Sequence, residues 1–283
     1  MNRNKGVLYN MIQLLVFILL LASCVCFATD TKEYKDVIYN ETSNRPLCMD
    51  IKYVADGKKK PLILLIHGGG WVEGTKESMC NFALPFFDSV YKEGFVVASI
   101  EYRFLQEGGI VKTIEDCKSA VRFLRKRADV YEIDPGRIIA CGHSAGAHLS
   151  SLLGLLPKEE KPSKVQGVLC FSGPLCFEDS EAKEYCQIMT EHLGLTDSKL
   201  KKIGDPFKNI NKDAAKFMVI HGSADSIVDY RPTEKFVGKM REYGLYCDYI
   251  LIDGDDHLAD YIKYKKEIMN FLNSFKDEKN DLD

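Results

Sequence analysis

A serine between two glycines is the first feature that could do chemistry. Residues 142–146 read GHSAG and match the pattern G-x-S-x-G, which alone is short enough to occur by chance. Its context is more specific, because the apolar run 138–141 precedes it and a helical pattern follows. Flanking glycines permit a tight strand-to-helix turn that exposes one hydroxyl beside the first N–H groups of the new helix. We therefore interpret Ser144 as a candidate nucleophile.

A serine hydroxyl is a weak nucleophile, and its natural base is a histidine, whose unperturbed pKa is about 6.5. Among the six histidines, His257 follows the apolar run 249–252 and precedes a helical pattern. A loop after a late strand lies at the carboxyl edge of a parallel sheet, where a base could reach Ser144. We therefore predict that His257 is the base.

The other five histidines have structural interpretations. His67 and His221 each end an apolar run and precede glycine, which suits hydrogen bonds that orient loops. We expect the side chain of His143 to point away from the nucleophile, His148 to be buried in the following helix, and His192 to lie in an irregular segment.

The base needs an acid that fixes its tautomer and stabilises the imidazolium. Asp225 follows another apolar run, in the stretch HGSADSIV at 221–228, and is our candidate for that acid. Asp229 and Asp256 are rivals. Asp256 adjoins the candidate base, and adjacent side chains rarely point at each other. Asp229 precedes a helical pattern, where capping is the ordinary role.

Three consecutive glycines at 68–70, within HGGGW, follow the apolar run 62–66. Attack of a serine on a carbonyl group creates a tetrahedral oxyanion, and each N–H donor placed in advance lowers the barrier by ~3 kcal/mol. We predict that the N–H groups of Gly69, Gly70 and Ala145 form this oxyanion hole. Taken alone, the glycine run would be an ordinary strand-to-loop turn.

Alternating strands and helices must position these residues. Apolar runs typical of buried strands stand at 61–66, 95–104, 137–141, 165–173, 216–222 and 246–253, after an edge hairpin at 34–40 and 47–54. Apolar spacings of three and four residues predict helices at 113–128, from 145, at 231–244 and at 258–275, with a DPGR turn at 134–137. The alternation predicts an α/β fold with a mainly parallel central sheet flanked by helices. Segment 174–210 is either a small cap over the site or a surface excursion.

Composition restricts the other functions. The chain has 283 residues and a net charge of −3, and its short basic runs at 58–60 and 125–127 give no support for nucleic-acid binding. Neither a C-x-x-C nor an H-E-x-x-H pattern occurs, so we expect no metal and no cofactor. The ten cysteines have no regular spacing that would indicate a disulfide framework.

The N-terminus predicts a secretory signal peptide, because Arg3 and Lys5 precede a short apolar run at 11–22. The alternative is an uncleaved membrane anchor. LASC at 21–24 resembles a bacterial lipobox, in which residues 1–23 are removed and Cys24 is lipidated; otherwise cleavage follows Ala28. We expect an exported protein, either a periplasmic or outer-surface lipoprotein or a secreted one, with a single domain at 24–283. The only membrane contact we expect is that lipid anchor.

The sequence resembles the α/β-hydrolase superfamily, in the branch of short-chain carboxylesterases that includes feruloyl- and acetyl-xylan-esterase-like and hormone-sensitive-lipase-like proteins. The stretches that carry the resemblance are HGGGW (67–71), EYR (101–103), DPGRIIACGHSAGAHLS (134–150), HGSADSIV (221–228) and DDH (255–257). They span nearly the whole exported chain. The chain order Ser144, Asp225, His257 is that of the superfamily, so the resemblance implies nucleophile, acid and base in that order. The chain departs from the family at Ala147, often a glycine there, and around DDHLAD.

The resemblance implies an α/β-hydrolase fold and hydrolysis of short acyl esters, such as acetyl or feruloyl groups on plant polysaccharide fragments. The substrate would be a small-molecule or oligosaccharide ester. Three alternatives stay open: an arylformamidase-like enzyme, a prolyl-oligopeptidase-like peptidase, and a non-catalytic binding protein on a hydrolase scaffold. The oligomeric state is not predicted.

Overall fold

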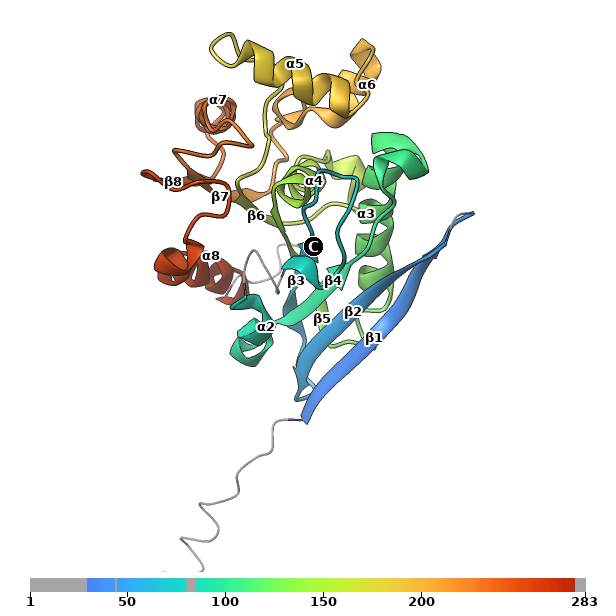
Figure 1. Ribbon diagram of the computed structural model, residues 1–283. Coiled ribbons are helices and arrows are strands. Elements are labelled where there is room, and N and C mark those ends of the chain that lie inside the picture. The colour runs from blue at the N-terminus through green and yellow to red at the C-terminus, as the bar shows by residue number, and fades with distance from the viewer. Residues whose placement is uncertain (1–29, 44, 80–84, 278–283) are drawn as a thin grey trace, which may run out of the picture. The chain divides into compact units, whose positions relative to one another are not determined.

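An eight-stranded sheet forms the centre of the computed structural model, which describes residues 30–43, 45–79 and 85–277 (Figure 1). The strands are β1 (Asp30–Glu41), β2 (Pro46–Ala55), β3 (Lys60–Ile66), β4 (Val96–Ile100), β5 (Ile133–His143), β6 (Gly167–Phe171), β7 (Lys216–Gly222) and β8 (Cys247–Ile252). Their order is β1-β2-β4-β3-β5-β6-β7-β8. β2 runs antiparallel to β4, and all pairs from β4 across to β8 are parallel. Parallel neighbours need crossover connections, which the helices provide.

Helices follow most of the strands. They are α2 (Phe87–Val90), α3 (Gly109–Lys126), α4 (Ala145–Gly154), α5 (Lys183–His192), α6 (Ser198–Gly204), α7 (Arg231–Glu242) and α8 (Lys265–Asp277). Short 3-10 turns stand at η2 (Tyr91–Glu93), η3 (Leu105–Glu107), η4 (Lys158–Glu160), η5 (Pro206–Asn209) and η6 (Tyr261–Tyr264).

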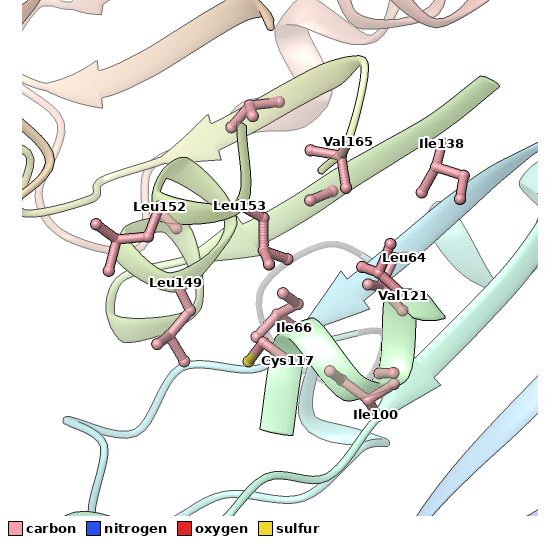
Figure 2. Close-up of a cluster of buried hydrophobic side chains, with 14 of the residues drawn as sticks. Leu64, Ile66, Ile100, Cys117, Val121, Ile138, Leu149, Leu152, Leu153 and Val165 are labelled. Atoms are coloured by element: carbon pink, nitrogen blue, oxygen red, sulfur yellow. The ribbon is translucent and has the colours of Figure 1, made fainter. Parts of the chain in front are cut away.

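Two apolar clusters cover the two faces of the sheet, because successive side chains of a strand point to opposite faces. In β3, Leu62, Leu64 and Ile66 belong to the cluster that includes α3, α4 and α7. Ile63 and Leu65 belong to the cluster that includes α2 and α8. Figure 2 shows part of the first cluster, where side chains of α3 and α4 lie against those of β3, β4 and β5. Burial on both faces explains why the central strands are apolar throughout.

The observed elements differ from the predicted ones mainly at their ends. Helix α3 begins at Gly109 rather than at residue 113. The DPGR stretch lies inside β5 instead of preceding it: Asp134 Oδ1 accepts the Gly136 N–H at 2.9 Å, and the β3–β5 register shifts there. The final helix begins as the 3-10 turn η6, so the residues directly after His257 are not helical.

Segment 174–210 contains α5, α6 and η5. In Figure 1, α5 and α6 (yellow to orange) lie at the top of the view, beyond α4. This segment therefore has helices of its own, and α5 contributes to the site described below.

The predicted signal peptide, including Cys24 and Ala28, lies outside the described residues. Within the described ranges, no helix combines the length and the apolar character needed to cross a bilayer. Among the cysteines there, Cys117, Cys141 and Cys170 are buried in the apolar core.

Candidate active site

Ser144 stands at a strained turn between β5 and α4. Its backbone has φ 54° and ψ −119°, a conformation that side chains other than glycine rarely adopt. A Cβ on Gly142 would lie 2.2 Å from Gly146 backbone atoms, and a Cβ on Gly146 would lie 1.9 Å from Ile66 O. The two glycines of the GHSAG pattern are therefore required by close approach of backbone, and the serine is left partly exposed at the start of a helix.

A histidine–aspartate pair lies on the loops after β8 and β7. His257 Nδ1 is 2.8 Å from Asp225 Oδ2, and the Asp225 side chain is fully buried. The other oxygen, Oδ1, accepts the N–H groups of Ile227 and Val228 at 3.0 and 2.8 Å. Because a carboxylate can only accept here, His257 carries its proton on Nδ1 and leaves Nε2 free to act as a base.

A second histidine contacts the same carboxylate. His221 Nε2 lies 3.1 Å from Asp225 Oδ2 and 3.0 Å from the carbonyl of Val228. Burial alone would raise the pKa of Asp225, yet the hydrogen bonds from His221 and His257 outweigh it and hold that pKa below its usual value. Sequence reasoning assigned His221 only to loop orientation and missed this contact.

The two rival carboxylates have other partners. Asp256 Oδ1 accepts the Ser226 N–H at 2.8 Å and the His257 backbone N–H at 2.7 Å. Asp229 pairs with Arg231. Its Oδ1 accepts hydrogen bonds from the backbone N–H of Arg231 at 3.0 Å and from Nε at 2.9 Å. Neither carboxylate contacts the imidazole of His257, which leaves Asp225 as its partner.

The carbonyl of His257 is held from two sides. It accepts His143 Nε2 at 2.9 Å and the hydroxyl of Tyr261 at 3.1 Å. The His143 ring also lies 4.7 Å from the His257 ring, centroid to centroid. Burial lowers the pKa of His143 to about 4, so this ring stays neutral. The side chain of His143 thus joins the turn at Ser144 to the loop that carries His257, a contact that the sequence did not predict.

The first glycine carbonyl after β3 is fixed by the protein core. Gly68 O lies 2.7 Å from His67 Nδ1 and accepts the Tyr102 hydroxyl at 3.3 Å. In a trans peptide the N–H points opposite to the carbonyl, so the N–H of Gly69 is directed away from these partners.

The second glycine carbonyl is fixed by a turn. Gly69 O accepts the N–H groups of Val72 and Glu73 at 3.0 and 3.1 Å, and Gly69 and Gly70 have φ of 102° and 58°. The N–H of Gly70 therefore points opposite to this turn. No acceptor in the described part of the chain takes the N–H of Gly69 or Gly70. Ala145, as the first residue of α4, likewise has no intrahelical acceptor for its N–H.

The third glycine carbonyl is held by segment 174–210. Gly70 O lies 2.9 Å from Nε2 of His192, the last residue of α5, and the His192 ring lies 5.7 Å from that of Trp71. Sequence reasoning placed His192 in an irregular segment without a role. The contact could not have been read from the sequence, because 122 residues separate its partners.

An open cleft of about 630 Å³ brings these groups together. Ser144 and His257 both line it, with Gly69 and Gly70 from the loop after β3, and Ile188, Met189 and His192 from α5. No hydrogen bond joins Ser144 Oγ to His257 among the described residues; such bonds are often long in the absence of substrate. The described ranges contain no cluster of side chains that could hold a metal ion.

The remaining predicted structural histidines are buried. His148 Nε2 lies 2.6 Å from Gly204 O, and the His67 ring stacks on Tyr102 at 4.2 Å. Burial lowers the pKa of His67 and of His148 to about 4. Both stay neutral near pH 7 and act through packing and hydrogen bonds.

A mainly parallel sheet, a strained serine between β5 and α4, and a histidine–aspartate pair on the loops after β8 and β7 define an α/β-hydrolase. The same class is found by comparison with known proteins. The chain belongs to the BD-FAE family, whose model matches residues 49–240.

Several curated relatives and several solved structures that the chain resembles are esterases. The chain is 25% identical to the esterase LipC of Mycobacterium tuberculosis over 237 residues, which cover 77% of this chain and 58% of LipC. It superposes on a thermophilic esterase of Thermogutta terrifontis with a TM-score of 0.74 and 22% identity, covering 88% of this chain and 94% of the other. A truncated carbohydrate esterase from gut microbiota gives a TM-score of 0.72 and 23% identity, with 88% and 98% covered. The solved structures support the fold, and the chain spans about half the length of the curated relatives it matches.

Proposed function

We propose that this protein is a serine carboxylic-ester hydrolase with Ser144 as nucleophile, His257 as base and Asp225 as acid. The observation that carries the proposal is the 2.8 Å contact between His257 Nδ1 and Asp225 Oδ2, on a cleft that also exposes Ser144. This contact fixes the tautomer in which the lone pair of His257 Nε2 can accept the serine proton.

The reaction is acyl transfer to water. Ser144 Oγ passes its proton to His257 Nε2 and bonds to the ester carbonyl carbon. The N–H groups of Gly69, Gly70 and Ala145 stabilise the oxyanion, because their directions are set before substrate binds. His257 then gives the proton to the leaving alcohol as the C–O bond breaks. Water, deprotonated by the same histidine, hydrolyses the acyl-enzyme and restores the serine.

The finer proposal is that the acyl groups are short, acetyl or feruloyl, on plant polysaccharide fragments. The family resemblance supports it, and one structural relative is a carbohydrate esterase from gut microbiota. We also propose that the protein is exported, with lipidation of Cys24 or cleavage after Ala28. Intact-mass measurement of the exported protein distinguishes these two outcomes.

The test is a panel of substrates run on wild type and Ser144→Ala: p-nitrophenyl acetate, acetylated xylan, feruloylated oligosaccharides, N-formylkynurenine and a peptide amide. Ester turnover that Ser144→Ala abolishes supports the proposal. Preference for N-formylkynurenine or the peptide would favour the arylformamidase or peptidase alternative. Failure of a fluorophosphonate to label Ser144, with no turnover of any ester, would favour a binding protein.

A further inference from the structure

Exposed aliphatic side chains gather around the candidate active site. Val72, Ile188, Ile227 and Leu258 are 42, 52, 62 and 65% exposed, and all four line the cleft that contains Ser144. They come from the loop after β3, from α5, and from the loops after β7 and β8. Single exposed apolar residues are normal on a surface, but several around one cleft indicate a site for an apolar group.

No permanently cationic side chain lines the same cleft in the described part of the chain. Its ionisable lining side chains among the described residues are two carboxylates, Glu73 and Asp256, and three histidines, with no lysine or arginine. A substrate that carries a carboxylate or phosphate near the ester would meet like charge with no cation to offset it. The lining therefore suits neutral esters.

The direction of proton transfer separates the two halves of the substrate. His257 protonates the leaving oxygen, so the alcohol lies on the side of His257, beside Ile227 and Leu258. The acyl group then lies on the other side, toward the oxyanion loop, which α5 borders through the contact from His192 to Gly70 O. Ile188 and Met189 on α5 line the cleft, and Ile188 lies one helical turn before His192 on the same face of the helix. This places the apolar side chains of α5 on the acyl side.

We propose that the acyl group of the preferred substrate is neutral, apolar and longer than acetyl, and that Ile188 and Met189 select it. An acetyl methyl would stay near Ser144 and leave this wall in contact with water, whereas a cleft of about 630 Å³ accommodates a larger group. The inference rests on the proposed ester hydrolysis and narrows its acyl class.

The experiment compares kcat/KM for p-nitrophenyl acetate, butyrate and hexanoate, all below the critical micelle concentration. A fully buried methylene contributes about fourfold to binding, so partial burial of four extra methylenes predicts a hexanoate-to-acetate ratio of about ten or more. Ile188→Asn should lower that ratio about fivefold.

Two controls locate the effect. Val130→Asn replaces a residue of similar exposure (53%) away from the cleft and should leave the ratio unchanged. Ile227→Asn, on the alcohol side, should change the rates for acetate and hexanoate by the same factor.

Wild type that prefers acetate, or an Ile188→Asn variant that loses acetate and hexanoate activity equally, would overturn the inference and leave the ester hydrolase intact. A preference for hexanoate that appears only when the ester forms micelles would also overturn the inference. The exposed aliphatic side chains around the cleft would then bind a lipid surface and not the acyl group. The proposed function itself fails on different results: no hydrolysis of any ester with Ser144 unlabelled, or a preference for N-formylkynurenine or the peptide over the esters.

Discussion

In the proposed mechanism, the negative charge of Asp225 keeps His257 in the tautomer that can act as a base. Asp225→Asn removes this charge. In wild type, Asp225 Oδ2 accepts a hydrogen bond from His257 Nδ1 and also lies beside Nε2 of His221. An asparagine that turns its NH₂ toward His257 would make Nδ1 the acceptor and move the proton to Nε2. That tautomer cannot take the proton of Ser144.

The expected loss in kcat is about 10³- to 10⁴-fold, which corresponds to about 4–5 kcal/mol of barrier at ~1.4 kcal/mol per tenfold. Because the hydrogen bonds to Asp225 hold its pKa below the usual value, the aspartate is ionised throughout the range from pH 5 to 9. The loss should therefore be present across that whole range. The assay is kcat for p-nitrophenyl butyrate at half-unit pH steps.

The matched control is Asp229→Asn, which removes a carboxylate four positions away that pairs with Arg231 and not with His257. It should keep kcat within about threefold, as expected for loss of an exposed ion pair. Thermal unfolding of each variant shows whether it is folded under assay conditions. A folded Asp225→Asn variant with more than a tenth of wild-type kcat, or an equal loss in Asp229→Asn, would refute this account of the base.

Three further predictions follow from other contacts. His192→Phe should lower kcat about three- to tenfold with KM within twofold, because the glycine loop loses the hydrogen bond that holds the carbonyl of Gly70. His192→Gln, which keeps a donor, should retain most of the wild-type rate. Equal losses in both variants would contradict this. Gly146→Ala should destabilise the protein by more than about 3 kcal/mol in chemical denaturation, because its Cβ would lie 1.9 Å from Ile66 O, and a stable variant would show that the turn relaxes. Burial raises the pKa of Asp205 to about 7, so the folded protein holds this proton more tightly than the unfolded chain does. The free energy of unfolding should therefore fall as pH rises from about 4 to 7. Asp205→Asn, which keeps the acceptor for the Phe207 N–H, should therefore be about 1–2 kcal/mol more stable than wild type at pH 8 and equal to it at pH 4, as measured by urea unfolding; a gain that does not vary with pH would contradict the burial argument.

The sequence allowed the central sheet to be predicted because both faces of its strands are covered, which leaves continuous apolar runs between helical spacings. It also indicated the turn at Ser144, since the flanking glycines approach each other closely within five residues of chain. These local or periodic signals can be read from a single sequence.

The contacts that complete the site are different in kind. His143 to the His257 carbonyl, His192 to the Gly70 carbonyl, and His221 to Asp225 depend on which loops meet after folding. For His143 and His192 the acceptor is a backbone carbonyl, which every residue carries, so no pattern of side chains marked these two histidines. Element ends were also less predictable, because Asp134 and its turn are tolerated inside β5 by a shift of register.

The bond from α5 to the glycine loop has a consequence for engineering. Segments like 174–210 are attractive to exchange between related enzymes, because they border the substrate and form their own helices. Here such a graft would also delete His192, the hydrogen-bond donor that holds the carbonyl of Gly70 in the loop of the proposed oxyanion hole. A chimera with a new helix at this place would change in kcat as well as in substrate specificity, unless the incoming segment supplies a hydrogen-bond donor to the carbonyl of Gly70.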